Sequence, residues 1–159
     1  MIYDLLKICV SIFFNLFNVV LGGRLPPFGS AAVIVEEKDH YLVVELPRGR
    51  IVFPGGFMSW KERPEQTAER EGKEETGLDL HIEDLVGFYH GASATWFQMS
   101  NISFVYQARV IGGQLQNNVE GRPCWMSESE LRLRLDRHAV VVLDDYLRHR
   151  EKQQNTQMV

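Results

Sequence analysis

The stretch that decides the fold runs from Gly56 to Leu78 and reads GFMSWKERPEQTAEREGKEETGL. Its second half predicts a helix over Pro64–Thr76, because proline suits the first helical position and the following Gly77 suits the position just past the end. Upstream, the short apolar run Ile51–Phe53 predicts a strand that is closed by the turn Pro54-Gly55-Gly56. The segment therefore predicts a strand, a glycine turn and a helix in succession.

Three carboxylates lie on this predicted helix at positions i, i+3 and i+4, namely Glu71, Glu74 and Glu75. That spacing places them on one face, where their like charges repel one another. A hard divalent cation such as Mg²⁺ or Mn²⁺ is the natural compensator, because these ions prefer oxygen ligands. The alternative is a solvated acidic face, with Arg70 and Lys73 offsetting the charge in surface pairs.

The whole stretch resembles the Nudix box, G-x5-E-x7-R-E-U-x-E-E-x-G-U, in which U is an apolar residue. Every charged and glycine position of that pattern is matched, by Gly56, Glu62, Arg70, Glu71, Glu74, Glu75 and Gly77. One apolar position departs, because Gly72 stands where the family has a bulky residue. A glycine there either leaves space for Trp60 or Phe57 to pack or marks a diverged site, and we favour the packing account because the charged positions are intact.

The resemblance implies an α/β fold, the Nudix α/β/α sandwich with a mixed sheet. It also implies Mg²⁺- or Mn²⁺-dependent hydrolysis of a diphosphate linkage in a nucleoside diphosphate derivative, such as an NTP or a nucleotide sugar. By position, Glu71, Glu74 and Glu75 match the metal-binding carboxylates, the backbone carbonyl of Gly56 matches a further ligand, and Arg70 with Glu62 matches a pair that braces the loop against the helix. The alternative is a catalytically weak Nudix-fold binding module.

A second segment, Glu120–Ser127, resembles the loop that supplies a further glutamate in MutT-type members of the family. Glu120 is therefore the candidate for an additional metal ligand or for the general base of catalysis, and the alternative is an ordinary loop glutamate. The segment Trp125–Leu131 extends the resemblance toward the C-terminus, since its W-x-S-x-x-E-L pattern precedes a final predicted helix.

Four further residues are candidates for substrate binding, each with a plainer alternative. Arg48 and Arg50 flank the glycine turn and could meet phosphates, or they simply carry surface charge. Trp96, near a predicted strand end, is a candidate to stack on a base, and the alternative is a core position, which is more common for such aromatic residues. His138 is a candidate base contact at the start of the last helix, where capping or surface exposure is the alternative.

Around the box, the sequence predicts alternating strands and helices, which favours a layered α/β domain over residues 28–150. One predicted helix begins at Ser127, which has N-cap chemistry, and a final one spans His138–Arg150. We expect residues 151–159 to form a flexible tail. The other predicted strands are Ser30–Glu36, His40–Glu45, Asp79–Tyr89, Asn101–Val110 and Pro123–Met126.

Composition limits the class of protein. The chain has 159 residues, of which 45% are hydrophobic, and this suits one globular domain. Its net charge of −4 disfavours a nucleic-acid coat, which needs a basic surface. The two cysteines, Cys9 and Cys124, exclude a disulfide scaffold and make a reducing, cytoplasmic setting the default.

Residues 1–24 stand apart as an apolar N-terminal helix that ends at Gly22-Gly23. Its polar residues Asp4, Lys7, Ser11, Asn15 and Asn18 fall within an arc of roughly 80°. Two interpretations remain open for residues 1–22. The helix packs on its own domain or on a second copy of the chain, or it associates with a membrane and tethers a hydrolase of a lipid-linked diphosphate. A signal peptide is disfavoured, because Asp4 accompanies Lys7 and no A-x-A site follows.

Overall fold

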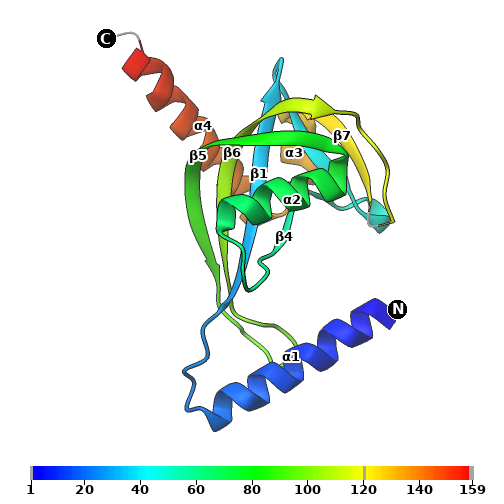
Figure 1. The fold of residues 1–159 in the computed structure, drawn as a ribbon, viewed down its shortest axis with the longest axis vertical. Coiled ribbons are helices and arrows are strands. Elements are labelled where there is room, and N and C mark those ends of the chain that lie inside the picture. The colour runs from blue at the N-terminus through cyan, green and yellow to red at the C-terminus, as the bar shows by residue number, and fades with distance from the viewer. Residues whose placement is uncertain (1, 120, 158–159) are drawn as a thin grey trace.

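The computed structural model describes residues 2–119 and 121–157, with the side chains of residues 8–119 and 121–156. Helix α2 (Pro64–Thr76) covers one face of a mixed β-sheet, and α3 (Glu128–Arg134) and α4 (Arg137–Gln157) cover the other (Figure 1). This arrangement confirms the predicted α/β sandwich with a mixed sheet.

The sheet is organised around one long strand, β1 (Phe28–Glu37). It pairs in parallel with β6 and antiparallel with β4 and β2, and its neighbours extend the sheet in the order β3-β2-β1-β6-β5, with β7 beside β2. The remaining strands are β2 (His40–Glu45), β3 (Ile51–Val52), β4 (Gly55–Phe57), β5 (Leu78–Gly91), β6 (Asn101–Gly113) and β7 (Arg122–Ser127).

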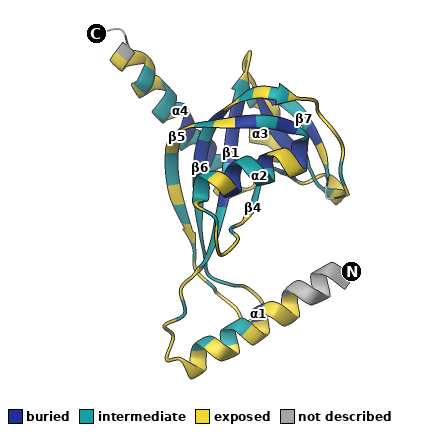
Figure 2. Cartoon of the chain, in the orientation of Figure 1, coloured by how far each residue is buried: buried dark blue, intermediate teal, exposed yellow. Residues whose placement is uncertain are grey.

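The middle of strand β1 is buried on both faces, which explains its apolar run from Ala31 to Val35. Successive side chains of a strand point to opposite faces. Val33 and Val35 accordingly pack with Ala68 of α2, and Ile34 packs with Leu143 of α4 on the other side. The centre of the sheet is therefore dark blue in Figure 2, and both helical layers are fixed to it by fully buried residues.

The structure corrects the predicted elements around the glycine turn. The predicted strand Ile51–Phe53 ends at Val52, and Gly55–Phe57, which we interpreted as a turn, forms the additional strand β4 beside β1. The glycine is what permits the pairing, because a Cβ at Gly55 would lie 2.6 Å from the Cα of Ala32. Helix α2 has the predicted bounds, and Gly77 takes the left-handed conformation (φ 79°) expected past its end.

The C-terminal segment also differs from the prediction. We expected a flexible tail from Glu151, but α4 continues to Gln157. Side chains near this end hold the helix to the sheet, since Gln153 donates to Asp84 of β5 at 3.1 Å and His149, just before position 151, lies 3.0 Å from the same carboxylate. Lysine and glutamine are also good helix formers, so the polar composition does not end the helix.

Helix α1 (Ile2–Val20) lies beyond one end of the sandwich, below the sheet in Figure 1. Its polar stripe contacts the protein. The Asn15 amide donates to the carbonyl oxygens of Trp96 and Gln98, at 3.0 and 2.9 Å, in the loop between β5 and β6. Phe14 packs on Phe28 of β1, with ring centroids 4.5 Å apart. In the part of the chain that the structure describes, no helix has both the length and the apolar character needed to cross a membrane.

Candidate active site

Helix α2 presents two different faces. Thr67, Ala68 and Thr76 are fully buried against the sheet, whereas Glu74 on the other face is 59% exposed at its side chain. Glu71 and Glu75 lie between these extremes, with 16% of the Glu71 side chain and 7% of the Glu75 residue exposed. The three carboxylates therefore follow the line where the helix leaves the core and meets the glycine strand β4.

The guanidinium of Arg70 connects the carboxylates of this region. It binds Glu62 through two hydrogen bonds, Nε to Oε1 at 2.7 Å and Nη2 to Oε2 at 2.9 Å. Its Nη1 atom donates to Glu71 at 2.8 Å and to Glu74 at 3.2 Å, and its Nη2 also donates to the carbonyl of Phe57 at 3.3 Å. Arg70 thus joins the loop after β4 to the acidic face of α2, and the predicted contact with Glu62 is present.

Arg70 also determines the protonation of Glu62. Its hydrogen bonds, helped by those from Thr67 and the Ser59 backbone, lower the pKa of Glu62 to about 2 from an ordinary value of 4.5. Because the native state favours the charged carboxylate, Glu62 contributes its full stabilisation above pH 4.5 and loses it as the pH falls toward 2.

We therefore expect Glu62→Gln to lower the melting temperature at neutral pH and to flatten the loss of stability between pH 4.5 and 2. Thermal unfolding followed at a series of pH values measures both effects. Glu69→Gln, which removes a carboxylate from α2 outside this network, is the control. An unchanged acid slope in Glu62→Gln would contradict the account.

The glycine strand meets two of the carboxylates directly. The backbone N–H of Gly55 donates to Oε2 of Glu75 at 2.9 Å. A Cβ at Gly56 would overlap the carboxylate of Glu71, so a side chain at position 56 would displace that carboxylate. The close approach of backbone and acid favours glycine at position 56, and it brings the Gly56 peptide next to the acidic face.

The donor chemistry of this region suits Mg²⁺ or Mn²⁺, which take carboxylate and carbonyl oxygens. The three carboxylates do not converge as they stand, because Glu71 and Glu74 share the guanidinium of Arg70 and Glu75 accepts from Gly55. Among the residues that the structure describes, no group of three acidic, histidine or cysteine side chains is arranged to hold a metal ion. A cation at this face would therefore compete with Arg70 for its ligands.

Glu120, the candidate additional ligand or general base, lies outside the described residues. The loop that leads to it is described, and it passes beside the end of α2. Asn118 donates from its amide to the backbone carbonyl of Glu74 at 2.9 Å, and it accepts from the Gly121 backbone at 2.8 Å. These contacts place Asn118 against the end of the acidic helix and Gly121 against Asn118.

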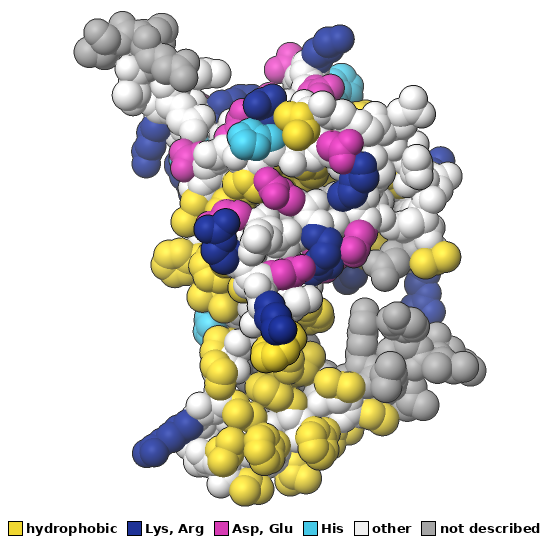
Figure 3. Space-filling model, in the orientation of Figure 1, with side chains coloured by type: hydrophobic (Ala, Val, Ile, Leu, Met, Phe, Trp, Pro, Cys, Tyr) yellow, Lys and Arg dark blue, Asp and Glu magenta, His cyan; other side chains and the backbone are white. Residues whose placement is uncertain are grey.

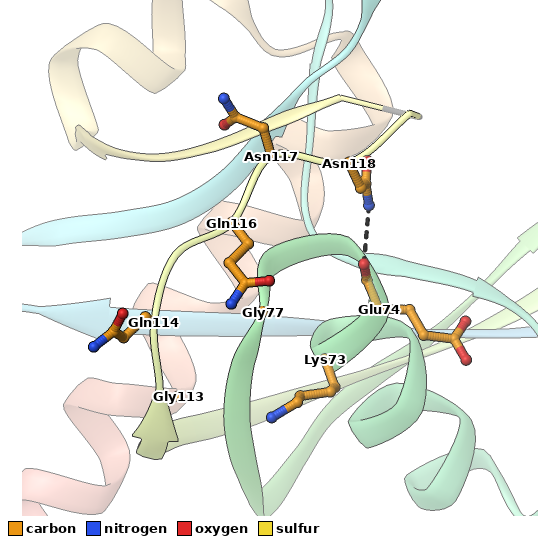
Figure 4. A pocket seen from close by; sticks show the side chains of 8 residues that line it. All are labelled: Lys73, Glu74, Gly77, Gly113, Gln114, Gln116, Asn117 and Asn118. Atoms are coloured by element: carbon orange, nitrogen blue, oxygen red, sulfur yellow. Dashed lines mark hydrogen bonds between the residues drawn. The ribbon is translucent and has the colours of Figure 1, made fainter.

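The same loop lines a hollow of about 480 Å³ that sequence reasoning missed (Figure 4). Its wall is made largely of amide side chains, which can both donate and accept hydrogen bonds. The signal in the sequence was the run QLQNN, four amides within five residues. The lining residues are Lys73, Glu74, Gly77, Gly113, Gln114, Gln116, Asn117 and Asn118.

The structure distributes the four candidate substrate-binding residues over three elements. Arg48 and Arg50 lie exposed at the turn between β2 and β3, where Arg48 has a positive φ of 74°. His138 packs edge-on against Tyr89 at 5.7 Å, at the start of α4. Trp96 lies on the loop that contacts α1. Their roles in binding substrate remain predictions.

Gly72 makes room for a neighbour, but the neighbour differs from the residues that we expected. A Cβ at position 72 would lie 2.5 Å from Cδ1 of Leu80 on β5. Trp60 and Phe57, the expected partners, are 90% and 54% exposed. The glycine therefore lets α2 approach the sheet closely over Leu80, which supports the packing account.

This contact predicts that Gly72→Leu destabilises the protein by about 1–3 kcal/mol through overpacking. Leu80→Ala should relieve the overlap, so the double variant should lose less stability than the sum of the two single variants. Chemical denaturation of the four proteins gives the coupling energy. Strict additivity would show that Leu80 is not the residue that excludes a side chain at position 72.

Comparison with known proteins agrees with this geometry. The model of the NUDIX domain matches residues 26–146. A MutT-like protein of Streptomyces ambofaciens is 27% identical over 125 residues, covering 75% of this chain and 78% of that relative. An ADP-ribose pyrophosphatase of Methanocaldococcus jannaschii is 33% identical over 87 residues, 52% of this chain and 51% of the relative. The solved structure of a NUDIX hydrolase from Nitrosomonas europaea superposes with a TM-score of 0.70 at 27% identity, covering 78% of this chain and 90% of that one.

The sandwich, the glycine strand and the acidic helix define a pyrophosphohydrolase of the Nudix type. Since the family's domain covers most of the chain, this protein belongs to the Nudix family.

Proposed function

We propose that the protein hydrolyses a diphosphate linkage in a nucleoside diphosphate derivative, such as an NTP or a nucleotide sugar, with Mg²⁺ or Mn²⁺ as cofactor. The observation that carries the proposal is the line of Glu71, Glu74 and Glu75 beside the Gly55-Gly56 backbone. The relatives support the substrate class, because one is MutT-like and another is an ADP-ribose pyrophosphatase.

In this proposal Glu71, Glu74, Glu75 and the Gly56 carbonyl would hold the cation, and Glu120 would be a further ligand or the general base. When bound, the cation neutralises phosphate charge and activates water for attack on phosphorus. A carboxylate within hydrogen-bond reach of that water takes its proton, which contributes about 10²–10⁴-fold to the rate. Arg70 positions Glu71 and Glu74 through its hydrogen bonds and is a positioning residue.

The experiment is a substrate panel of NTPs, ADP-ribose and nucleotide sugars, assayed for released phosphate, pyrophosphate and nucleoside monophosphate with and without Mg²⁺. We expect metal-dependent turnover of at least one compound. Metal-dependent binding of nucleotides without turnover would instead support the binding-module alternative.

A second candidate substrate, a lipid-linked diphosphate, is favoured by one observation. Aromatic contacts connect the apolar helix α1 to the catalytic segment, since Phe14 packs on Phe28 and Phe28 meets Phe57 at 6.0 Å. Phe57 directly follows Gly56, so these contacts lead from α1 to the glycine strand beside the acidic helix. Adding an isoprenoid diphosphate in detergent to the same panel tests this candidate.

A further inference from the structure

Helix α1 exposes its apolar surface to the solvent, which is the reverse of an ordinary surface helix. An amphipathic helix of a soluble domain directs its apolar stripe to the core. Here Phe13 and Val20 are 72% and 73% exposed, and Figure 3 shows an apolar surface around this helix. The other exposed large side chains of the helix and its end are Ile8, Val10, Ile12, Leu16, Phe17, Val19 and Leu21.

The orientation of the helix is fixed by its polar stripe, which faces the protein. Ser11 is only 4% exposed, and Asn15 donates to two carbonyl oxygens of the loop between β5 and β6. Asn18 accepts from the Leu25 backbone at 2.9 Å. Rotating α1 to bury its apolar side chains would break all of these contacts, so the apolar exposure is a property of the fold.

A second element contributes to the same surface. The loop whose carbonyls accept hydrogen bonds from Asn15 carries Trp96 and Phe97, which are 54% and 60% exposed. Aromatic side chains, tryptophan above all, are favoured where a protein meets the interface of a lipid bilayer. We define the apolar platform as the exposed side chains of residues 8–21 together with Trp96 and Phe97.

The platform is almost free of charge. Residues 8–35 contain one charged residue, Arg24, and the loop residues 91–100 contain none. In the view of Figure 3 no acidic side chain interrupts the apolar surface around α1. A surface that held acidic groups would be repelled by anionic headgroups, whereas a single cation at its edge is compatible with them.

The width of the apolar arc decides which partner can cover it. At 100° per residue, the exposed side chains from Ile8 to Leu21 span an arc of about 220°. One packed helix covers a stripe of roughly 100°, so a second copy docked through α1 would leave about half of the arc in water. A lipid layer is a continuous apolar phase that follows the surface of the helix, so it can cover the whole arc while the polar stripe stays on the protein.

We infer that the apolar platform binds the surface of a lipid bilayer, with α1 lying along the interface and Trp96 and Phe97 inserted beside it. The polar stripe stays on the sandwich and the apolar arc enters the acyl boundary, so the domain is held on the membrane by its own helix. The inference concerns location and does not depend on which diphosphate the enzyme cleaves.

Co-sedimentation of the full chain with phosphatidylcholine vesicles tests this inference. We expect the wild-type protein to bind, and Phe13→Asp/Phe17→Asp to weaken binding by more than about tenfold, because binding scales with buried apolar area. Leu133→Asp is the matched control, since Leu133 is 87% exposed on α3, away from the platform, and its replacement should leave binding unchanged. Circular dichroism confirms that each variant is folded.

A second readout follows the loop. Vesicles should shift the tryptophan emission of the wild-type protein to the blue, and Trp96→Phe should remove that shift. Absence of vesicle binding by the wild-type protein would overturn the inference. A second result would also overturn it: a wild-type dimer in sedimentation velocity that does not bind vesicles and that Phe13→Asp/Phe17→Asp dissociates. The platform would then be an interface between two copies.

Discussion

Replacing Glu75 with glutamine should lower the metal-dependent hydrolysis rate by at least about 10²-fold, while the protein remains folded. Glu75 is the most buried of the three acidic side chains, with 7% of the residue exposed. An amide binds a divalent cation more weakly than a carboxylate does, and it cannot accept a proton from water. Its oxygen can still accept the hydrogen bond from Gly55, so strand β4 should keep its position.

The matched control is Glu69→Gln, the same substitution on the same helix but outside the Arg70 network. We expect its kcat/KM to stay within about twofold of the wild-type value, as surface substitutions are usually nearly neutral. Equal rates for the wild type and Glu75→Gln would remove Glu75 from the catalytic machinery, and a similar loss in both variants would point to a general effect of charge on α2.

Arg70→Lys should lower metal affinity or activity by about 10–100-fold, the usual effect of removing a residue that orients ligands. Lysine keeps the charge but loses the planar fork that binds Glu62 through two atoms and reaches Glu71 and Glu74 from a third. The carboxylates would then be held less firmly for the cation. Isothermal titration with Mn²⁺, together with the rate measured against Mn²⁺ concentration, separates affinity from turnover.

The opposite result has a clear meaning as well. In the structure Arg70 pairs with Glu71 and Glu74, two of the proposed metal ligands, so it would compete with a cation for them. If Arg70→Lys bound Mn²⁺ more tightly than the wild type, competition would outweigh positioning, and our assignment of Arg70 as a positioning residue would be wrong. Arg109→Lys, on an exposed pair with Glu83 of β5, is the control for loss of a guanidinium.

Local signals explain how much of the fold could be predicted. Helix α2 was predicted with its observed bounds, because Pro64 and Gly77 mark its ends through backbone geometry alone. Strand β4 could not be predicted in this way, since Gly55 and Gly56 indicate a turn in isolation. They form a strand because they pair with β1 in the folded sheet. That pairing brings β1 so close that a side chain at position 55 would not fit.

The candidate site shows the same difference between features that local sequence predicts and features that depend on the folded structure. The spacing of Glu71, Glu74 and Glu75 showed that they share a helix face, and Arg70 was a possible partner for their charge. The sequence could not show that the same guanidinium also binds Glu62 and the Phe57 carbonyl. That depends on where the loop after β4 places Glu62 and Phe57 around Arg70. Likewise, Gly72 indicated missing volume, while the identity of Leu80 as the neighbour depends on the pairing of β5 in the folded sheet.

Helix α1 shows a different limit on what a sequence can predict about structure. The sequence indicated a narrow polar stripe, and a stripe of that kind predicts a preferred side without stating which side faces the protein. The carbonyl groups of the loop around Trp96 determine that the polar side faces the protein, because the Asn15 amide donates to two of them. Such a contact joins residues more than eighty positions apart, which no periodicity reveals.

The most direct test of the central claim is anomalous diffraction from crystals of the full chain soaked in Mn²⁺. Our account predicts a manganese peak bound by carboxylate oxygens of Glu71, Glu74 and Glu75, with the Arg70 guanidinium withdrawn from at least one of them. A crystal that contains Mn²⁺ elsewhere or nowhere, with Arg70 still bound to Glu71 and Glu74, would contradict the account.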